Sequence, residues 1–261
     1  MKLSISLIIS LLALTGCSSI VTLDLSNVNQ STPPTISTTI TYPTWQTVQS
    51  GIDFKQVTSE IEGHTELFDL VRIDPEQVQL EFVVDEALPK TVSSWQESLG
   101  ATVVINGSYF DEDYALVTRT KTNSAEFGPW LTGHTGMIWQ RQSGWLIAAA
   151  DPLTPGSAEQ LLQSYPLLVS AGKSAVTQSI DDTAQRSAIG IDDDGYLYLI
   201  IAEYGTLTLS QLSQALTTAD LPAMDTVLNL DGGSSTGLAV LSDTVNYLDD
   251  SFVVPSVIVL Y

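Results

Sequence analysis

The chain has 261 residues, enough for one large domain or two small ones. Nine lysines and arginines stand against 30 aspartates and glutamates, so the formal net charge at pH 7 is -21. A surface this acidic makes nucleic acids and anionic membrane surfaces poor binding partners. It would also repel an anionic substrate unless a cation lies at the binding site, and Arg186 is the candidate for that cation.

Residues 1–16 are predicted to be a lipoprotein signal peptide. Lys2 supplies the positive start, and the apolar stretch 3–14 is too short to cross a bilayer. The following motif LTGC resembles a bacterial lipobox, in which cleavage precedes the cysteine and that cysteine carries lipid. Cys17 is the only cysteine, so we expect a lipid anchor there and no disulfide in the folded domain. Ser18 after the cysteine favours the outer membrane of the bacterial cell envelope.

Residues 17–44 are rich in Ser, Thr, Asn and Pro and show neither a helical nor a strand period. This composition is typical of a flexible tether. We therefore expect a single folded domain at residues 45–261.

Within that domain, most segments have the apolar pattern of strands. The segment 65–84 predicts two strands joined by a turn at residues 74–76, and Gln185 to Ala202 predicts a hairpin around an Asp/Gly turn. Further strands are expected at 101–105, 137–150 with a turn at 142–144, 165–169, 226–230 and 252–260. Short helices are expected at 91–99, 157–164 and 208–218, the last two from capping-box sequences. The expected fold class is α+β, a large mixed or antiparallel sheet with a few short helices.

The stretch TVLNLDGGSSTGLAV (226–240) is the predicted centre of the chemistry. A buried strand ends at Asp231, which is followed by Gly232, Gly233, Ser234 and Ser235. Glycines let the backbone approach a ligand closely, and successive N–H groups in such a turn form an anion-binding nest. The alternative is a plain hairpin turn, because Asp-Gly is also a common hairpin signal.

A second strand ends in a similar way at Asn106-Gly107-Ser108-Tyr109-Phe110. The polar segment 111–136 that follows carries His134, and long irregular segments of this kind are more often functional than connecting. His134 is a candidate for proton transfer, ahead of His64. No metal or other cofactor is expected, since the sequence has no paired histidines and the three aspartates 192–194 lack the spacing of a calcium loop.

Five segments together resemble the phosphodiester glycosidase family: VRIDPEQVQLEF (71–82), VVINGSYFD (103–111), YPLLVSAGK (165–173), RSAIGIDDDGYLYLI (186–200) and LNLDGGSSTGLAV (228–240). The resemblance covers roughly residues 65–261. It implies hydrolysis of a sugar phosphodiester at the anomeric carbon, with a phosphate-linked glycan as substrate. The matching positions are Asn106, Gly107, Arg186, Asp231, Gly232, Gly233 and Ser235. Departures from the family pattern are Ser108 and Tyr109, where Gly and Phe are more frequent, and Ser234 in place of a third Gly.

The chemistry explains why one carboxylate and one arginine suffice for such a reaction. A phosphate monoester leaves with a conjugate-acid pKa of about 6, so it needs no full protonation. We expect Asp231 to activate water or to act as nucleophile, and Arg186 to bind the phosphate with its planar guanidinium. The N–H groups of Gly232 and Gly233, with Ser234 and Ser235, would complete an oxyanion cradle.

The sequence allows two roles for each of three further residues. Asn106 either contacts the sugar or only bonds backbone at its strand end. Tyr109 either stacks on the sugar or packs in the protein, and Arg186 either binds phosphate or forms a surface ion pair. For the whole chain, the alternatives to a glycosidase are a non-catalytic surface lipoprotein that binds or helps assemble exopolysaccharide, and a phosphodiesterase that cuts the P–O bond.

Overall fold

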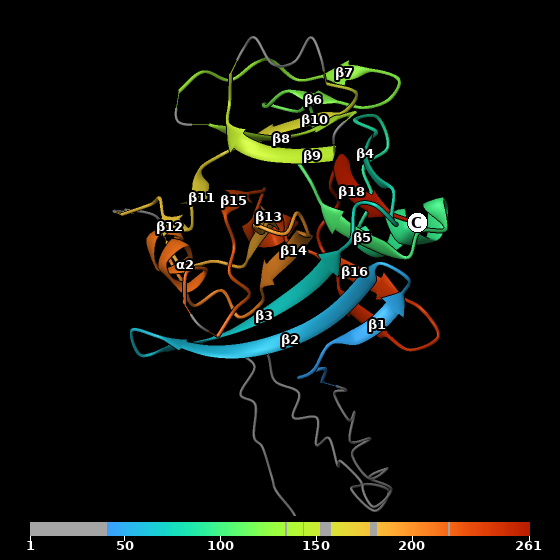
Figure 1. The fold of residues 1–261 in the computed structure, drawn as a ribbon. Coiled ribbons are helices and arrows are strands. Elements are labelled where there is room, and N and C mark those ends of the chain that lie inside the picture. Colours follow the sequence, from blue (N-terminus) through green and yellow to red (C-terminus); the bar gives the residue numbers. More distant parts are fainter. Residues whose placement is uncertain (1–40, 134, 143, 152–157, 178–181, 219) are drawn as a thin grey trace, which may run out of the picture. The chain divides into compact units, whose positions relative to one another are not determined.

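The computed structural model describes residues 41–133, 135–142, 144–151, 158–177, 182–218 and 220–261. Thr41–Tyr261 form one compact unit. In this part of the chain, strands form three sheets accompanied by two α-helices (Figure 1). Neighbouring strands in every sheet run antiparallel. The predicted fold class is confirmed, and of its two forms the antiparallel one is observed.

The largest sheet has eight strands in the order β1-β2-β3-β14-β13-β15-β11-β12. Their bounds are β1 Gln46–Gln49, β2 Ile52–Ile61, β3 His64–Ile73, β14 Leu197–Ala202, β13 Arg186–Ile191, β15 Thr226–Asn229, β11 Leu167–Ser170 and β12 Lys173–Ser174.

The two smaller sheets have five strands each, in the orders β7-β6-β10-β8-β9 and β17-β16-β5-β18-β4. The first contains β7 Glu126–Phe127, β6 Thr120–Lys121, β10 Leu161–Ser164, β8 Gly136–Arg141 and β9 Gly144–Ala149. The second contains β17 Asn246–Asp249, β16 Leu238–Leu241, β5 Val103–Asn106, β18 Ser256–Leu260 and β4 Leu80–Val84.

The main hydrophobic core is shared by all three sheets. Phe54 of β2, Ile105 of β5 and Ile138 of β8 belong to one buried cluster. Burial of apolar area of this kind is the dominant favourable contribution to folding. The shared core holds the ends of β5, β13 and β15 in fixed positions, and these are the strand ends that carry the predicted site.

Both described helices begin where local signals predict; α1 also ends there, whereas α2 ends at Ala215, before the predicted residue 218. The helix α1 (Val92–Leu99) begins after Thr91, whose side chain accepts a hydrogen bond from Ser94 N, and ends at Gly100 with φ 64°. The helix α2 (Leu209–Ala215) begins with a complete capping box formed by Thr208 and Gln211. The confirmed predictions each rest on contacts within one turn of helix.

The prediction of a helix at 157–164 is wrong. Its described part contains the strand β10, which pairs with β8 on one side and β6 on the other. The Gln160 side chain bonds the backbone of another sheet instead of capping a helix, accepting from Phe82 N at 2.9 Å and donating to Leu80 O at 3.2 Å. Long-range pairing therefore overrides the local capping sequence.

The two strands predicted in 65–84 are confirmed as β3 and β4, but they enter different sheets. In the turn after β3, Gly51 O accepts a hydrogen bond from Asp74 N at 2.8 Å, and β4 then pairs with β18 in another sheet. The hairpins β8–β9 and β13–β14 agree with prediction.

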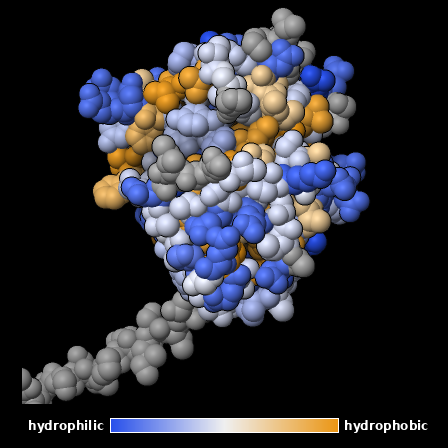
Figure 2. Space-filling view, turned by 90° about the vertical axis from the view of Figure 1, so that its left-hand side faces the viewer, coloured by the Kyte–Doolittle hydropathy of each residue, from blue (hydrophilic) through white to orange (hydrophobic). Residues whose placement is uncertain are grey.

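Figure 2 shows one face of the molecule, with a hydrophilic patch in its lower half and most of the hydrophobic residues in its upper half, where hydrophilic residues lie at both sides. In the described residues, no helix is both long and apolar enough to span a membrane.

Asp69 on β3 is a fully buried carboxyl group in the large sheet. Its oxygens accept from Gln56 Nε2 at 2.9 Å and lie 2.7 Å from the Tyr247 hydroxyl, which is also 3.2 Å from Glu203 Oε2. Burial raises the pKa of Asp69 to about 7, and the carboxylates of Glu203 and Asp249 add to the rise. Between about pH 4 and pH 7 the native state therefore holds a proton that the unfolded state has released. The free energy of unfolding must fall as pH rises through this window.

We predict that Asp69→Asn stabilises the protein at pH 8 and has little effect at pH 5. The amide is neutral at both pH values, and its NH2 group donates to the Tyr247 oxygen while Tyr247 donates to Glu203. A gain of about 1 kcal/mol raises the melting temperature by about 2–4 °C in a protein of this size. Thermal unfolding of both proteins at the two pH values measures the effect, with the exposed Asp243→Asn as control. An Asp69→Asn protein that is no more stable at pH 8 would contradict the buried, protonated state.

Candidate active site

The turn after β15 is fixed by backbone hydrogen bonds to two other strand ends. Leu230 N donates to Ser187 O at 2.8 Å and Gly233 N donates to Gln185 O at 2.8 Å, which ties the turn to the start of β13. Asp231 N donates to Gly107 O at 3.2 Å, which ties it to the end of β5. Segments near residues 106, 186 and 231 are thereby brought together, as the sequence predicts for the site.

The carboxyl group of Asp231 is half-buried in this turn. Its Oδ1 accepts from the N–H of Gly232 at 2.9 Å, and the Ser235 hydroxyl bonds the same carboxyl group. Burial raises the pKa of Asp231 to about 6, although both hydrogen bonds act in the opposite direction. A carboxyl group with this pKa changes its charge close to neutral pH, which suits a proton-transfer or nucleophilic role.

The expected oxyanion cradle differs from what the structure contains. The N–H of Gly232 is used by Asp231, and the N–H of Gly233 by the Gln185 carbonyl. Ser235 is buried and bonded to Asp231, whereas Ser234 is exposed at the surface of the turn. The N–H groups of the two glycines thus shape the turn and orient the carboxylate.

The two glycines are required for different reasons. Gly233 has φ 64°, a conformation that residues with a Cβ rarely adopt. A Cβ on Gly232 would lie 3.1 Å from Gln185 O and 3.4 Å from Arg186 Cδ. The close approach of the turn to Arg186 therefore depends on the missing side chain at 232.

Asn106 is fully buried at the end of β5 and joins the three segments through its side chain. Its Nδ2 donates to Asp231 O at 2.7 Å, and its Oδ1 accepts from Ser187 Oγ at 2.6 Å and from Gly237 N at 3.3 Å. Of the two interpretations left open by the sequence, these contacts favour the backbone-bonding one.

Gly107 and Ser108 continue this buried junction. A Cβ on Gly107 would lie 2.8 Å from Ser256 Oγ, so the strand end can pass β18 only with glycine here. Ser108 N donates to that same Ser256 Oγ at 2.8 Å, and the Ser108 hydroxyl lies 2.6 Å from the Thr120 hydroxyl. The Ser108 side chain therefore faces the protein interior.

Arg186 is the first residue of β13 and is half-buried. Its Nη2 donates to Asp182 O at 2.8 Å, which fixes one side of the guanidinium. The charges of both Arg186 and Asp231 act on the hydroxyl group of Tyr109, the aspartate raising its pKa and the arginine lowering it. Both charges therefore lie close enough to Tyr109 to act on its hydroxyl group.

Tyr109 belongs to a small network that the sequence does not predict. Asn229 Nδ2 donates to the Tyr109 oxygen at 2.7 Å, to Tyr165 O at 3.1 Å and to Leu230 O at 2.7 Å. The Tyr109 hydroxyl lies 3.2 Å from Tyr165 O, and the two tyrosine rings are stacked with centroids 4.6 Å apart. Burial, chiefly, raises the pKa of Tyr109, so its hydroxyl keeps its proton at neutral pH.

Some predicted residues are not assigned to the site. His134 and Cys17 lie outside the described residues, so the proton-transfer role, the lipid anchor and the envelope location remain predictions from the sequence. His64 is exposed at the start of β3 in the β2–β3 hairpin. In the described part of the chain, no group of three or more His, Cys, Asp and Glu side chains has the arrangement of a metal site.

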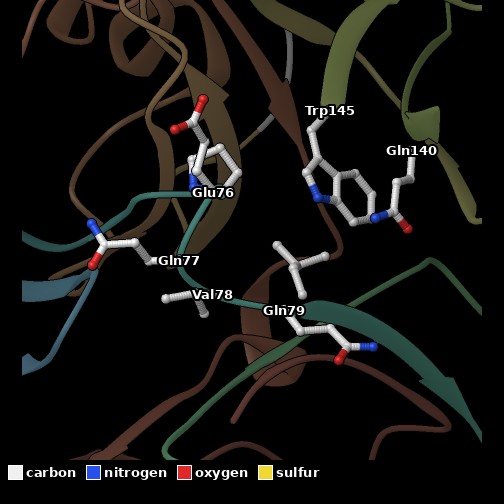
Figure 3. Close-up of a pocket in the computed structure, with 8 residues that line it drawn as sticks. Glu76, Gln77, Val78, Gln79, Gln140 and Trp145 are labelled. Atoms are coloured by element: carbon white, nitrogen blue, oxygen red, sulfur yellow. The ribbon is translucent and has the colours of Figure 1, made fainter. Parts of the chain in front are cut away.

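A hollow of about 280 Å³ lies elsewhere, between residues 75–80 and the β8–β9 hairpin (Figure 3). Trp145 and Gln140 line one side, and Glu76, Gln77 and Gln79 line the other. None of its lining residues is a predicted site residue, and Trp145 also packs edge-on against Phe82 at 5.5 Å. The hollow therefore contains none of the residues that the sequence assigns to the site.

The family model described as phosphodiester glycosidase matches residues 99–261, more than half of the chain. The chain belongs to the phosphodiester glycosidase family. The matched region includes all the strand ends that meet at Asp231. No curated protein sequence matches the chain.

Solved structures of the same fold agree with this membership. The zebrafish N-acetylglucosamine-1-phosphodiester α-N-acetylglucosaminidase catalytic domain, auto-inhibited by its pro-peptide, is similar with a TM-score of 0.67 at 16% identity, covering 84% of this chain and 86% of that one. A hypothetical protein from Synechocystis is similar with a TM-score of 0.60 at 16% identity, covering 81% of this chain and 62% of that one. At such identities the likeness establishes the shared fold alone.

The sequence analysis did not identify three residues of the candidate site around Asp231: Ser187, Asn229 and Tyr165. Ser187 and Asn229 are fully buried polar residues inside apolar strands. A polar residue in an otherwise apolar strand is the available signal, because buried polar groups need hydrogen-bond partners. Their partners come from distant segments, so the signal does not reveal what they bind.

We predict that Asn106→Ala destabilises the protein by at least about 2 kcal/mol, because Ser187 Oγ, Gly237 N and Asp231 O each lose a buried partner. Urea unfolding measures the loss. The exposed Asn246→Ala is the matched control and should change stability by less than about 0.5 kcal/mol. If Asn106→Ala unfolds at the wild-type urea concentration, Asn106 does not hold the strand ends together.

Proposed function

We propose that the chain is a hydrolase that cleaves glycosyl-1-phosphodiesters at the anomeric carbon. The observation that carries the proposal is the half-buried Asp231 carboxyl group, held in a rigid turn against the Arg186 segment. Membership in the phosphodiester glycosidase family supports the same reaction class. The name of the zebrafish enzyme contains N-acetylglucosamine-1-phosphodiester, so that sugar phosphate is a suitable first probe.

In the proposed reaction, the bond between the anomeric carbon and the phosphate oxygen breaks. The phosphate monoester leaves with the bonding electron pair, and water supplies the hydroxyl group that the sugar gains. Because this leaving group is stable as an anion near neutral pH, it needs no carboxylic acid to protonate it. The reaction differs in this respect from ordinary glycoside hydrolysis, which uses two carboxyl groups, one of them to protonate the leaving group.

Asp231 acts in its ionised form in this proposal. It either takes the proton of the attacking water or attacks the anomeric carbon itself to form a glycosyl ester that water then hydrolyses. Gly232 N–H and the Ser235 hydroxyl orient the carboxylate for either route. The pKa of about 6 leaves it mostly ionised at pH 7 while still basic enough to accept a proton.

Arg186 binds the phosphate in this proposal. A guanidinium matches two phosphate oxygens at once, which a lysine ammonium does not. In a chain of net charge -21, such a cation is needed to offset repulsion of an anionic substrate. Asn106 contributes as a positioning residue, because its amide fixes the backbone at Asp231.

Product analysis tests the reaction. We expect the wild-type protein to hydrolyse the methyl diester of N-acetylglucosamine 1-phosphate. In water enriched in oxygen-18, the label should enter the sugar and not methyl phosphate. Label in the phosphate would show P–O cleavage and assign the chain to the phosphodiesterases. Absence of turnover with this and other sugar-1-phosphodiesters would favour a non-catalytic glycan-binding protein.

The pH dependence tests the role of Asp231. We predict that kcat/KM rises with pH to an inflection near 6 and is level above it, because only the ionised carboxylate is active. Asp231→Asn should lower kcat by about 100-fold or more at pH 7, whereas the exposed Asp243→Asn should retain wild-type activity. An activity that instead falls as pH rises through 6 would assign Asp231 the role of a proton donor.

A further inference from the structure

Tyr165 combines exposure with a fixed position beside the candidate active site. The residue is 38% exposed, and its ring stacks on that of Tyr109 with an interplanar angle of 19°. Apolar side chains that remain exposed without covering a core contribute little to folding. The exposed ring is therefore available to a ligand.

The backbone of Tyr165 is anchored to the strand that leads into Asp231. Its carbonyl oxygen accepts from Asn229 Nδ2 at 3.1 Å, and the next carbonyl, of Pro166, accepts from Asn229 N at 3.0 Å. Asn229 precedes Asp231 by only two residues. The backbone at Tyr165 is thus held to the strand that leads into Asp231 through one buried asparagine.

The inner ring of the pair lies within the electrostatic influence of the reacting groups. The hydroxyl group of Tyr109 responds to the charges of Asp231 and Arg186. Asn229 holds this hydroxyl oxygen from one side at 2.7 Å. Asn229 thus links the stacked rings to the strand that leads into Asp231, and the pair reaches the surface at Tyr165.

An aromatic face selects between the two parts of a glycosyl phosphodiester. The face carries partial negative charge, so it repels a phosphate group and attracts the positively polarised C–H groups on one side of a pyranose ring. The phosphate has a better partner in Arg186. The ring pair is therefore suited to the sugar.

We propose that Tyr165, supported by Tyr109, is a specificity-determining residue whose ring binds the sugar ring of the substrate. This assignment rests on the proposed function for its place in the reaction. The tyrosine hydroxyl is dispensable, since the stacking face makes the contact. Tyr165→Phe should accordingly behave like the wild type, and Tyr165→Ala should not.

The experiment compares Tyr165→Ala, Tyr165→Phe and Tyr261→Ala, the last a control at a tyrosine that is 43% exposed. With the methyl diester of N-acetylglucosamine 1-phosphate, Tyr165→Ala should raise KM by about tenfold with little change in kcat. The other two variants should stay within about twofold of wild-type KM. An unchanged KM for Tyr165→Ala overturns the proposal.

Two further measurements separate other outcomes. If Tyr165→Ala raises KM for a nitrophenyl diester of the same sugar phosphate but not for the methyl diester, the ring binds the leaving group. The assignment to the sugar is then overturned. If the wild type turns over no sugar phosphodiester, the proposed function fails, and NMR titration with N-acetylglucosamine 1-phosphate decides on Tyr165. Binding to the wild type that Tyr165→Ala abolishes supports the sugar contact, and equal binding to both proteins or to neither overturns it.

Discussion

The side-chain amide of Asn106 is the interaction on which the candidate site depends. It joins the end of β5 to the Asp231 turn and to the Ser187 hydroxyl on β13, and its buried position excludes water from these bonds. β5 and β13 belong to different sheets. This buried amide therefore joins two sheets at the place where the predicted reacting groups lie, together with the backbone hydrogen bonds of the turn. Hydrogen bonds in such a dry environment are costly to lose, because the separated partners find no substitute.

The same junction explains how an acidic protein offers a site to an anion. Asp231 is mostly ionised at pH 7, so the positive charge that an anionic substrate needs must come from Arg186. Arg186 is placed beside the turn by its position at the start of β13, and Gly232 permits the close approach. The local field at the turn thus differs from that of the surface as a whole, which remains strongly anionic.

Polar residues in the strands have two distinct roles in this fold. Ser187 and Asn229 are buried and serve the turn through hydrogen bonds. Asp69, also buried, lies in a separate cluster with Tyr247 and Glu203 and affects stability through its proton. Both roles follow from placing hydrogen-bonding groups in low-dielectric surroundings, where protonation and pairing have large energetic effects.

Local signals in the sequence determined much of the secondary structure and the identity of the central turn. The caps of α1 and α2, the β13–β14 hairpin and the positive φ of Gly233 are each decided by neighbouring residues. The motifs also indicated the family, and the segments containing Asn106, Arg186 and Asp231 do meet.

Only the tertiary structure decided which sheet each strand joins and which partners each polar group finds. β10 is a strand despite its capping sequence, because it completes a ladder between β6 and β8. The N–H groups of Gly232 and Gly233 donate to Asp231 and Gln185 within the protein. Asn229 bonds Tyr109 and Tyr165, each more than sixty residues away in the sequence. Such contacts depend on segments distant in the chain, so no local pattern encodes them.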